Sequence, residues 1–149
     1  MISTYFGNIS FRMADYEVEK YILEKYNLDV TIFSKTREPN KKYMLFKMYT
    51  NNSENIEFSV IKKNNKFTDD YITQRHKHYF NMWKSSNESD FKIREKEEKG
   101  LLINYETYLE GNIESTNDII NFYNFCGDNF MKEWEIYIYK SNKKIYPLR

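Results

Sequence analysis

The chain has 149 residues, of which 23 are Lys or Arg and 22 are Asp or Glu, so its net charge is only +1. A nearly neutral chain has no overall field that would attract nucleic acid or an acidic membrane surface. The single cysteine, Cys126, excludes a disulfide within the chain and a cysteine-based zinc site. The length fits one domain over residues 1–149, and no apolar run approaches the roughly 20 residues that cross a bilayer.

The N-terminal sequence does not predict a signal peptide, because Met1 to Phe6 contains no basic segment followed by an apolar run. As written, the chain is therefore expected to be cytoplasmic. The alternative is an extracytoplasmic, membrane-anchored protein whose native N-terminal signal has been removed.

The first helix is expected from about Asp15 to Tyr26. Asp15 can cap its start, and Lys25 complements the helix dipole in the last turn. A single apolar stripe recurs at four-residue spacing: Ala14, Val18, Ile22 and Tyr26. Asn27 is expected to end the helix.

Three short strands are expected next, because apolar and polar residues alternate over residues 30–33, 43–49 and 56–60. Their apolar faces consist of Val30 and Ile32, of Met44, Phe46 and Met48, and of Ile56, Phe58 and Val60. Thr31 and Phe33 alternate with the first pair. Polar turns separate the strands, so they are predicted to form an antiparallel meander with one face in water.

A second helix is expected to open at Thr68, Asp69 and Asp70 and to reach about Trp83. Its apolar stripe is Ile72, His76, Tyr79, Phe80 and Trp83. A short strand is expected from Phe91 to Arg94, and the charged run at 95–99 is interpreted as a solvated turn.

Clean alternation from Leu101 to Leu109 predicts a longer strand. A third helix is expected from Ser115 to Gly127, because Ser115 and Asp118 form a variant of the capping box. The stripe of this helix is Ile119, Phe122, Tyr123 and Cys126. The final strands are expected over 134–139 and around 145–146, where Pro147 closes the last one.

Together these elements predict an α+β fold with one antiparallel sheet of about five to seven strands and two or three helices packed on one face. Strands joined by tight turns cannot be parallel, so a doubly wound fold is not expected. The sequence shows no internal repeat and no linker, which favours a single domain.

No motif identifies a reaction, and no catalytic residue, metal site or cofactor is predicted. His76 and His78 point about 200° apart on a helix, so they cannot share a metal ion. His76 is interpreted as a core histidine; the alternative is a small enzyme that uses His76 with a nearby carboxylate. Asp69 and Asp70 are expected to cap the second helix. Cys126 is expected to be a small buried hydrophobe.

The remaining functional signal is a group of tyrosines and lysines on the strands. The predicted partner-binding residues are Tyr43, Lys47, Tyr49, Tyr137, Tyr139 and Lys140. Tyrosines next to cations can stack on single-stranded nucleic acid or anchor a protein interface. Four glutamates share these strands and would repel phosphate, which favours a protein partner: Glu54, Glu57, Glu106 and Glu135. Half-buried tyrosines also occur on sheets that bind no partner.

Three segments resemble small Gram-positive proteins that combine a helix, a meander and a second helix. They are Glu19–Tyr26, the Glu-Phe-x-Val strand within Ile56–Val60, and the Asp-x-Tyr helix start within Thr68–Tyr71. Some such proteins are lipoproteins, and others are immunity proteins of polymorphic toxins, including the TipC type that protects from the cell exterior. The resemblance covers about half of the chain and implies action by occlusion, with no catalytic residues to transfer.

Three hypotheses follow. The first is a non-enzymatic immunity or inhibitor protein, a monomer or weak dimer, that binds and occludes a cognate bacterial toxin. The second is a phage or mobile-element accessory protein that neutralises a host defence system. The third is the small enzyme organised around His76.

Overall fold

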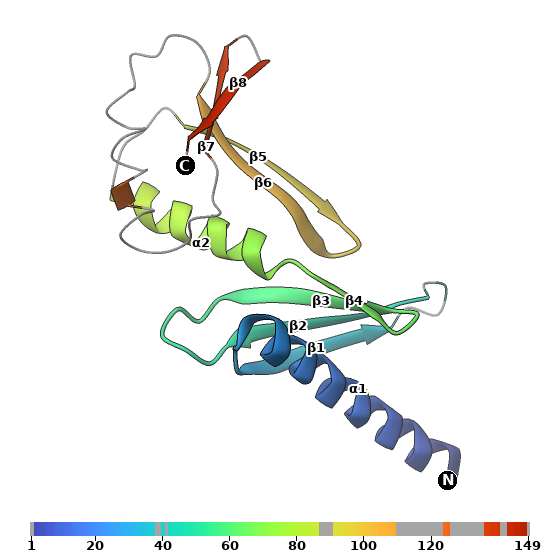
Figure 1. Cartoon of the computed structure of the whole chain (residues 1–149). Coiled ribbons are helices and arrows are strands. Elements are labelled where there is room, and N and C mark those ends of the chain that lie inside the picture. The colour runs from blue at the N-terminus through green and yellow to red at the C-terminus, as the bar shows by residue number, and fades with distance from the viewer. Residues whose placement is uncertain are drawn as a thin grey trace. The chain divides into compact units, whose positions relative to one another are not determined.

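The computed structural model of the protein describes residues 2–37, 40, 42–86, 91–109, 124–125, 136–140 and 143–148. Among these, side chains are described for residues 14–37, 40, 42–86, 91–108 and 124–125. The chain clusters into two compact units, Met1–Tyr71 with Lys99–Leu101, and Ile72–Glu98 with Leu102–Arg149. Each unit has its own helix and its own strands (Figure 1). The single domain expected over residues 1–149 stays a prediction.

The first unit is a helix on one face of an antiparallel meander. Its elements are α1 (Ile2–Tyr26), β1 (Val30–Arg37), β2 (Met44–Thr50), β3 (Glu57–Lys63) and β4 (Lys66–Asp69). The strands lie in the order β1-β2-β3-β4, and each neighbouring pair is antiparallel. This confirms the α+β class and the predicted meander.

Strand β4 was not predicted, and a tight turn explains it. Asn64 and Asn65 have φ angles of 51° and 61° and are the only two residues between β3 and β4. Two successive residues of positive φ form a hairpin turn whose twist matches that of the strands, and Asn tolerates this conformation. Thr68 therefore lies in β4, and the predicted second helix begins at Tyr71 instead.

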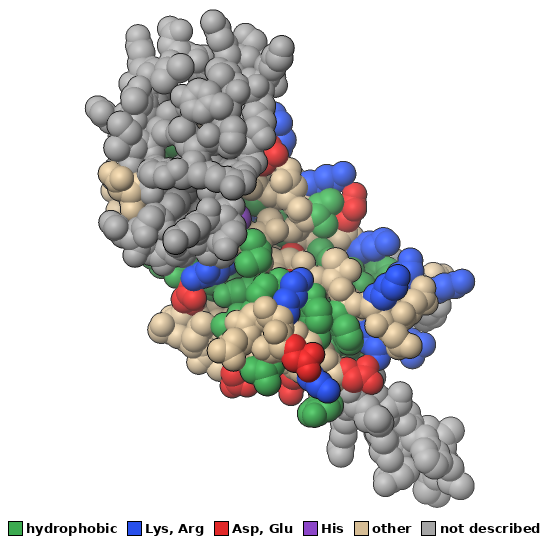
Figure 2. Space-filling model, viewed as in Figure 1, with side chains coloured by type: hydrophobic (Ala, Val, Ile, Leu, Met, Phe, Trp, Pro, Cys, Tyr) green, Lys and Arg blue, Asp and Glu red, His purple; other side chains and the backbone are tan. Residues whose placement is uncertain are grey.

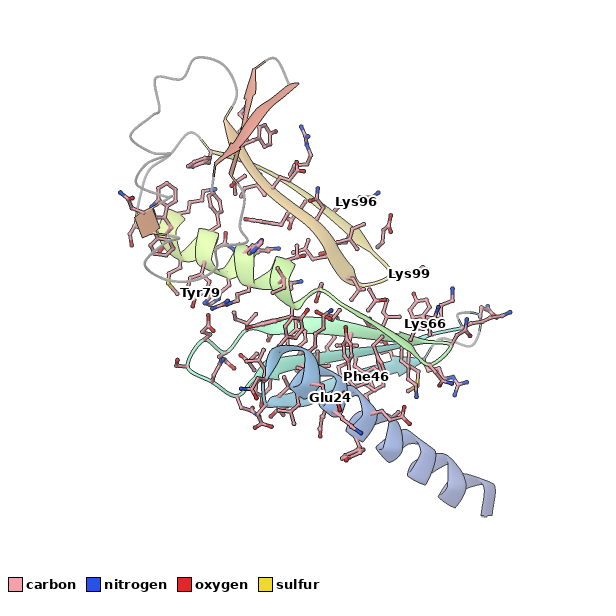
Figure 3. All side chains as sticks on the ribbon, in the orientation of Figure 1. Glu24, Phe46, Lys66, Tyr79, Lys96 and Lys99 are labelled. Carbon is pink, nitrogen blue, oxygen red and sulfur yellow. The ribbon has the colours of Figure 1, made fainter. Side chains whose placement is uncertain are left out.

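The core of the first unit lies between α1 and the sheet. It contains Ala14, Val18 and Ile22 from the helix, and Phe46, Met48, Phe58 and Val60 from the strands. Figure 3 labels Phe46 at the centre of this layer. The four-residue stripe of the helix and the period-two stripes of the strands thus meet as predicted, because each element buries only its apolar side.

Helix α1 begins at Ile2, so the predicted start at Asp15 is wrong. Residues 2–14 contain one glycine and no proline, so no strong breaker stops the helix upstream. Asp15 lies inside the helix, where its carboxylate accepts a hydrogen bond from Lys35 Nζ at 2.9 Å. The predicted end is confirmed: Asn27 has a φ of 55° and donates its N–H to the carbonyl of Leu23 at 2.9 Å, a left-handed helix cap.

Among its described residues, the second unit has helix α2 and four strands. They are α2 (Tyr71–Lys84), β5 (Lys92–Glu98), β6 (Leu101–Leu109), β7 (Ile136–Lys140) and β8 (Lys143–Leu148). The first residue of α2, Tyr71, belongs to the first unit. The strand order is β5-β6-β7-β8. Each sheet has four strands, fewer than the five to seven predicted for one sheet. The expectation of a wholly antiparallel arrangement is wrong for β6 and β7, which are parallel.

The charged run at 95–99 is mostly strand, which corrects its interpretation as a turn. Residues 95–98 belong to β5, and only Lys99 and Gly100 form the turn to β6, with φ angles of 56° and 87°. Charged side chains suit β5 because it is the edge strand of its sheet. Pro147 lies within β8 and does not close it. Strand β8 is the other edge of this sheet, and proline is tolerated in an edge strand because it can lack a backbone N–H partner on the unpaired side.

The core of the second unit is aromatic. Phe80 is fully buried, with its ring centroid 6.0 Å from those of Trp83 and Phe91 and 6.2 Å from that of Tyr105. Residues Tyr79, Phe80 and Trp83 of the predicted helix stripe are buried. The predicted third helix, with Cys126, lies outside the described residues except for 124–125, which are helical. Neither α1 nor α2 has the length and apolar character that crossing a membrane requires.

Candidate partner-binding surface

The sheet face that points away from α1 carries two of the predicted residues, Lys47 and Tyr49. Phe46 and Met48 of β2 are fully buried on the helix side, so the alternating Lys47 and Tyr49 lie on the opposite face. Lys47 is exposed and Tyr49 is half-buried. The predicted placement of these two residues opposite the Met and Phe side chains is therefore correct.

A bulge in β1 adds Phe33 to this face. Ile32 pairs with Met48 and Ser34 pairs with Lys47, so Phe33 is the extra residue of the strand. Its side chain is 50% exposed, and its ring stacks on Tyr49 with centroids 6.0 Å apart and an interplanar angle of 25°. We define Thr31, Phe33, Lys47 and Tyr49 as the outer patch.

Polar groups hold the margin of the outer patch. Tyr49 pairs with Thr31 on one side and with Glu57 on the other. Thr31 Oγ1 donates a hydrogen bond to Asn51 Oδ1 at 2.7 Å, and Asn51 Nδ2 donates to Asp29 Oδ2 at 2.8 Å. Hydrogen-bonded polar groups therefore border the two rings, and a polar rim of this kind is typical of protein interfaces.

Phe33 is the residue that the sequence prediction missed. The alternation of residues 30–33 did assign it to the face opposite Val30 and Ile32, which was the available signal. The predicted surface consists only of tyrosines and lysines, so it leaves Phe33 out. The bulge is what sets Phe33 and Ser34 together opposite Lys47.

The structure brings together only part of the predicted surface. Tyr43 immediately precedes β2 and is half-buried, with Lys99 Nζ 5.9 Å from its ring centroid. Tyr137, Tyr139 and Lys140 belong to β7 in the second unit, and their side chains lie outside the described residues. The outer patch therefore consists of residues of the first unit alone.

Asp69 is the centre of a buried polar cluster that sequence spacing did not reveal. Its side chain is 1% exposed. The hydroxyl groups of Tyr21 and Tyr26 donate to it at 2.5 Å and 2.7 Å. Lys25 Nζ and the backbone N–H of Tyr71 each donate to it at 3.0 Å. The last contact is the capping role that was predicted for Asp69, and the other three tie α1 to the end of β4.

The electrostatics of this cluster favour an ionised carboxylate. Burial alone would raise the pKa of Asp69, but the hydrogen bonds from Tyr21, Tyr26 and Lys25 outweigh it and lower that pKa below its usual value. Burial and the Asp69 charge raise the pKa of both tyrosines. All four side chains therefore keep one protonation state near neutral pH, which suits a structural cluster better than proton transfer.

His76 is half-buried on α2, as its place on the apolar stripe predicts. Burial, together with the nearby charge of Arg75, lowers the pKa of His76 to about 4. Its imidazole is therefore neutral at pH 7. A general base works best with a pKa near the operating pH, so this value does not favour the catalytic alternative.

Acidification is expected to destabilise the protein through His76. The unfolded chain binds more protons than the folded one between pH values of about 6.5 and 4, so stability falls as the pH drops through this window. Replacing His76 with Leu should remove about 2 kcal/mol of the stability difference between about pH 7.5 and pH 5. Urea unfolding at both pH values measures it, with His78→Leu as the control. Equal pH dependence in wild type and His76→Leu would contradict the assignment.

Two further ion pairs in the described part of the first unit join α1 to the sheet. Lys35 pairs with Asp15 at 2.9 Å, and Lys62 pairs with Glu17, so both contacts fasten α1 to the sheet. Figure 2 shows acidic and basic side chains side by side on the viewed face.

Within the described residues, no group of three or more His, Cys, Asp or Glu side chains could hold a metal ion. Comparisons with protein-family models, with curated proteins and with solved structures find no match.

Proposed function

We propose that the protein is a non-enzymatic immunity or inhibitor protein that binds a cognate bacterial toxin through the outer patch and occludes it. The observation that carries the proposal is the stacked pair Phe33 and Tyr49 on a sheet face that is otherwise polar at its margin. Exposed apolar rings on a sheet face gain free energy when a partner covers them. Aromatic residues are also the commonest anchors of protein interfaces.

A protein partner fits this surface better than nucleic acid. Lys47 is the only cation of the outer patch, and Glu57 lies directly beside Tyr49 in the strand register. A phosphate backbone would meet one positive charge and a nearby negative one. A protein partner can match both signs and cover the two rings at the same time.

The resemblance to Gram-positive immunity proteins of the TipC type supports the proposal through the scaffold. The segments that carry it are 19–26, 56–60 and 68–71. In the first unit these segments supply the end of α1, strand β3 and the Asp69 cluster. An immunity protein needs such a rigid support, while the surface it carries varies with the toxin. The proposed location is the cytoplasm, with the membrane-anchored cell exterior as the alternative.

Binding to the product of the neighbouring toxin gene tests the proposal. Phe33→Ala and Tyr49→Ala should each weaken the complex by about 10- to 100-fold, because truncating an aromatic anchor costs about 1–3 kcal/mol of binding free energy. The melting temperature should change little, since both rings lie at the surface. Isothermal titration calorimetry measures the affinity.

Met82→Ala provides the matched control, because Met82 is 46% exposed and lies on α2, outside the outer patch. It should leave the affinity unchanged. If both aromatic variants bind as tightly as wild type, the outer patch is not the interface. If a variant instead unfolds at a much lower temperature, its ring belongs to the core.

A further inference from the structure

Positive charge gathers at the end of the first sheet that lies opposite the outer patch. Arg37 pairs with Met44, and Met44 pairs with Lys62, so the end of β1, the start of β2 and the end of β3 form one row across the sheet. Lys63 pairs with Lys66 across the turn between β3 and β4. Five exposed cations belong to this row and its neighbourhood, and we call them the basic end: Arg37, Lys42, Lys63, Lys66 and Lys99.

Lys99 joins the basic end because the turn between β5 and β6 packs on β2. Residues Lys99–Leu101 belong to the first unit. A Cβ added to Gly100 would lie 2.8 Å from Leu45 Cδ2, so the glycine permits this close approach. Lys99 Nζ lies 5.9 Å from the centre of the Tyr43 ring. An aromatic ring therefore lies among the cations, and Figure 3 labels Lys66 and Lys99.

The charge of the basic end is not neutralised within the part of the chain that the structure describes. The ion pairs of the described residues include none of the five cations, whereas Lys62 beside them pairs with Glu17. Lys63 and Lys66 lie directly opposite each other, an arrangement of like charges that destabilises a hairpin. Glu57 begins β3 six residues before Lys63, about 20 Å away along the strand. The net charge of +1 therefore coexists with a local excess of positive charge.

We propose that the basic end binds the phosphate backbone of single-stranded nucleic acid. The cations extend across four strands, which is about 14 Å at the usual spacing between strands, so they can follow a linear polyanion. Sites for single strands combine such a row of cations with aromatic side chains that contact the bases, and Tyr43 provides a ring here. Contacts to phosphate carry no sequence information, so the binding should be independent of sequence.

An anionic membrane fits the basic end less well. Peripheral membrane proteins usually combine cations with apolar side chains that enter the lipid interface. The exposed large apolar side chains described in the first unit are Tyr16 and Leu23 of α1 and Phe33 in the bulge of β1, not residues of this row. The proposal goes beyond toxin binding and does not depend on it, because the basic end and the outer patch share no residue.

Fluorescence anisotropy of a labelled oligothymidylate of about 12 nucleotides, a length within the usual range of single-strand sites, tests the proposal on the full chain. With five phosphate contacts, the logarithm of the association constant should fall against the logarithm of the salt concentration with a slope of about −3.5. The variant Lys63→Ala/Lys66→Ala should reduce the slope to about −2 and weaken binding about 25-fold at about 0.1 M salt. Both side chains are exposed, so the variant should melt no lower than wild type.

Lys20→Ala/Lys84→Ala is the matched control, because it removes the same charge from exposed lysines of α1 and α2. It should leave the affinity and the slope unchanged. An equal loss of affinity in both double variants would assign the binding to overall charge and overturn the proposal. So would a wild-type protein that binds no oligonucleotide at low salt. Binding to phosphatidylserine vesicles without binding to the oligonucleotide would assign the basic end to a membrane surface and also overturn it.

Discussion

Replacing Asp69 with Ala is expected to lower the free energy of unfolding by about 3–5 kcal/mol, because removing one partner of a buried charged cluster leaves the others unsatisfied. Three side chains and one backbone N–H donate to this carboxylate. The hydroxyl groups of Tyr21 and Tyr26 would lose their acceptor inside a partly buried site. Urea unfolding at neutral pH measures the change.

Glu24→Ala is the matched control for this prediction. Glu24 is an exposed carboxylate on α1, and its oxygen lies 3.9 Å from Lys20 Nζ. Exposed pairs of this kind contribute little, so the control should change stability by less than about 0.5 kcal/mol. If Asp69→Ala and Glu24→Ala had equal effects, the Asp69 cluster would not hold α1 to the sheet.

Replacing Phe80 with Ala is expected to cost about 3–5 kcal/mol in the second unit. Phe80 is fully buried, and its ring lies within 6.2 Å, centroid to centroid, of Trp83, Phe91 and Tyr105. Truncation would remove the contacts at the centre of this aromatic cluster and leave a cavity. The change should appear in the denaturant midpoint and as a loss of near-ultraviolet circular dichroism.

Met82→Ala is the control on the same helix, because Met82 is 46% exposed. It should change stability by less than about 0.5 kcal/mol. A small effect of Phe80→Ala, comparable with that of the control, would contradict the assignment of Phe80 to the core of the second unit.

Elements whose burial pattern is regular could be predicted from the sequence. The stripe Ala14, Val18 and Ile22 gave the buried side of α1. Alternation over 101–109 gave the observed ends of β6 but not its buried side, because Leu102 is buried and Ile103 is 43% exposed. Features that depend on local backbone geometry could not. The turn at Asn64 and Asn65, which creates β4, has no hydrophobic signal, and its left-handed conformation is visible only in the φ angles.

Long-range pairing was the second source of error. Tyr21 and Asp69 lie 48 residues apart in sequence, so spacing could not bring them into one cluster. Likewise, β6 and β7 are separated by residues 110–135, and a connection of that length permits parallel strands. Tight turns enforce antiparallel pairing only in the meander, where the antiparallel prediction is confirmed.

The outer patch shows the effect of both local backbone geometry and long-range pairing on what could be predicted. Lys47 and Tyr49 were predicted because β2 alternates regularly, whereas Phe33 enters the patch through a bulge. The residues predicted beside them, Tyr137, Tyr139 and Lys140, belong to the second unit. Their participation in binding stays a prediction.

Inhibition of the neighbouring toxin is the most direct test of the proposed occlusion. The toxin's activity would be titrated with wild-type protein and with the double variant Phe33→Ala/Tyr49→Ala. Wild type should abolish the activity at one copy per toxin, while the double variant should leave most of it at the same ratio and melt near the wild-type temperature. Full inhibition by a folded double variant, or a toxin that stays active with wild type in excess, would contradict the account.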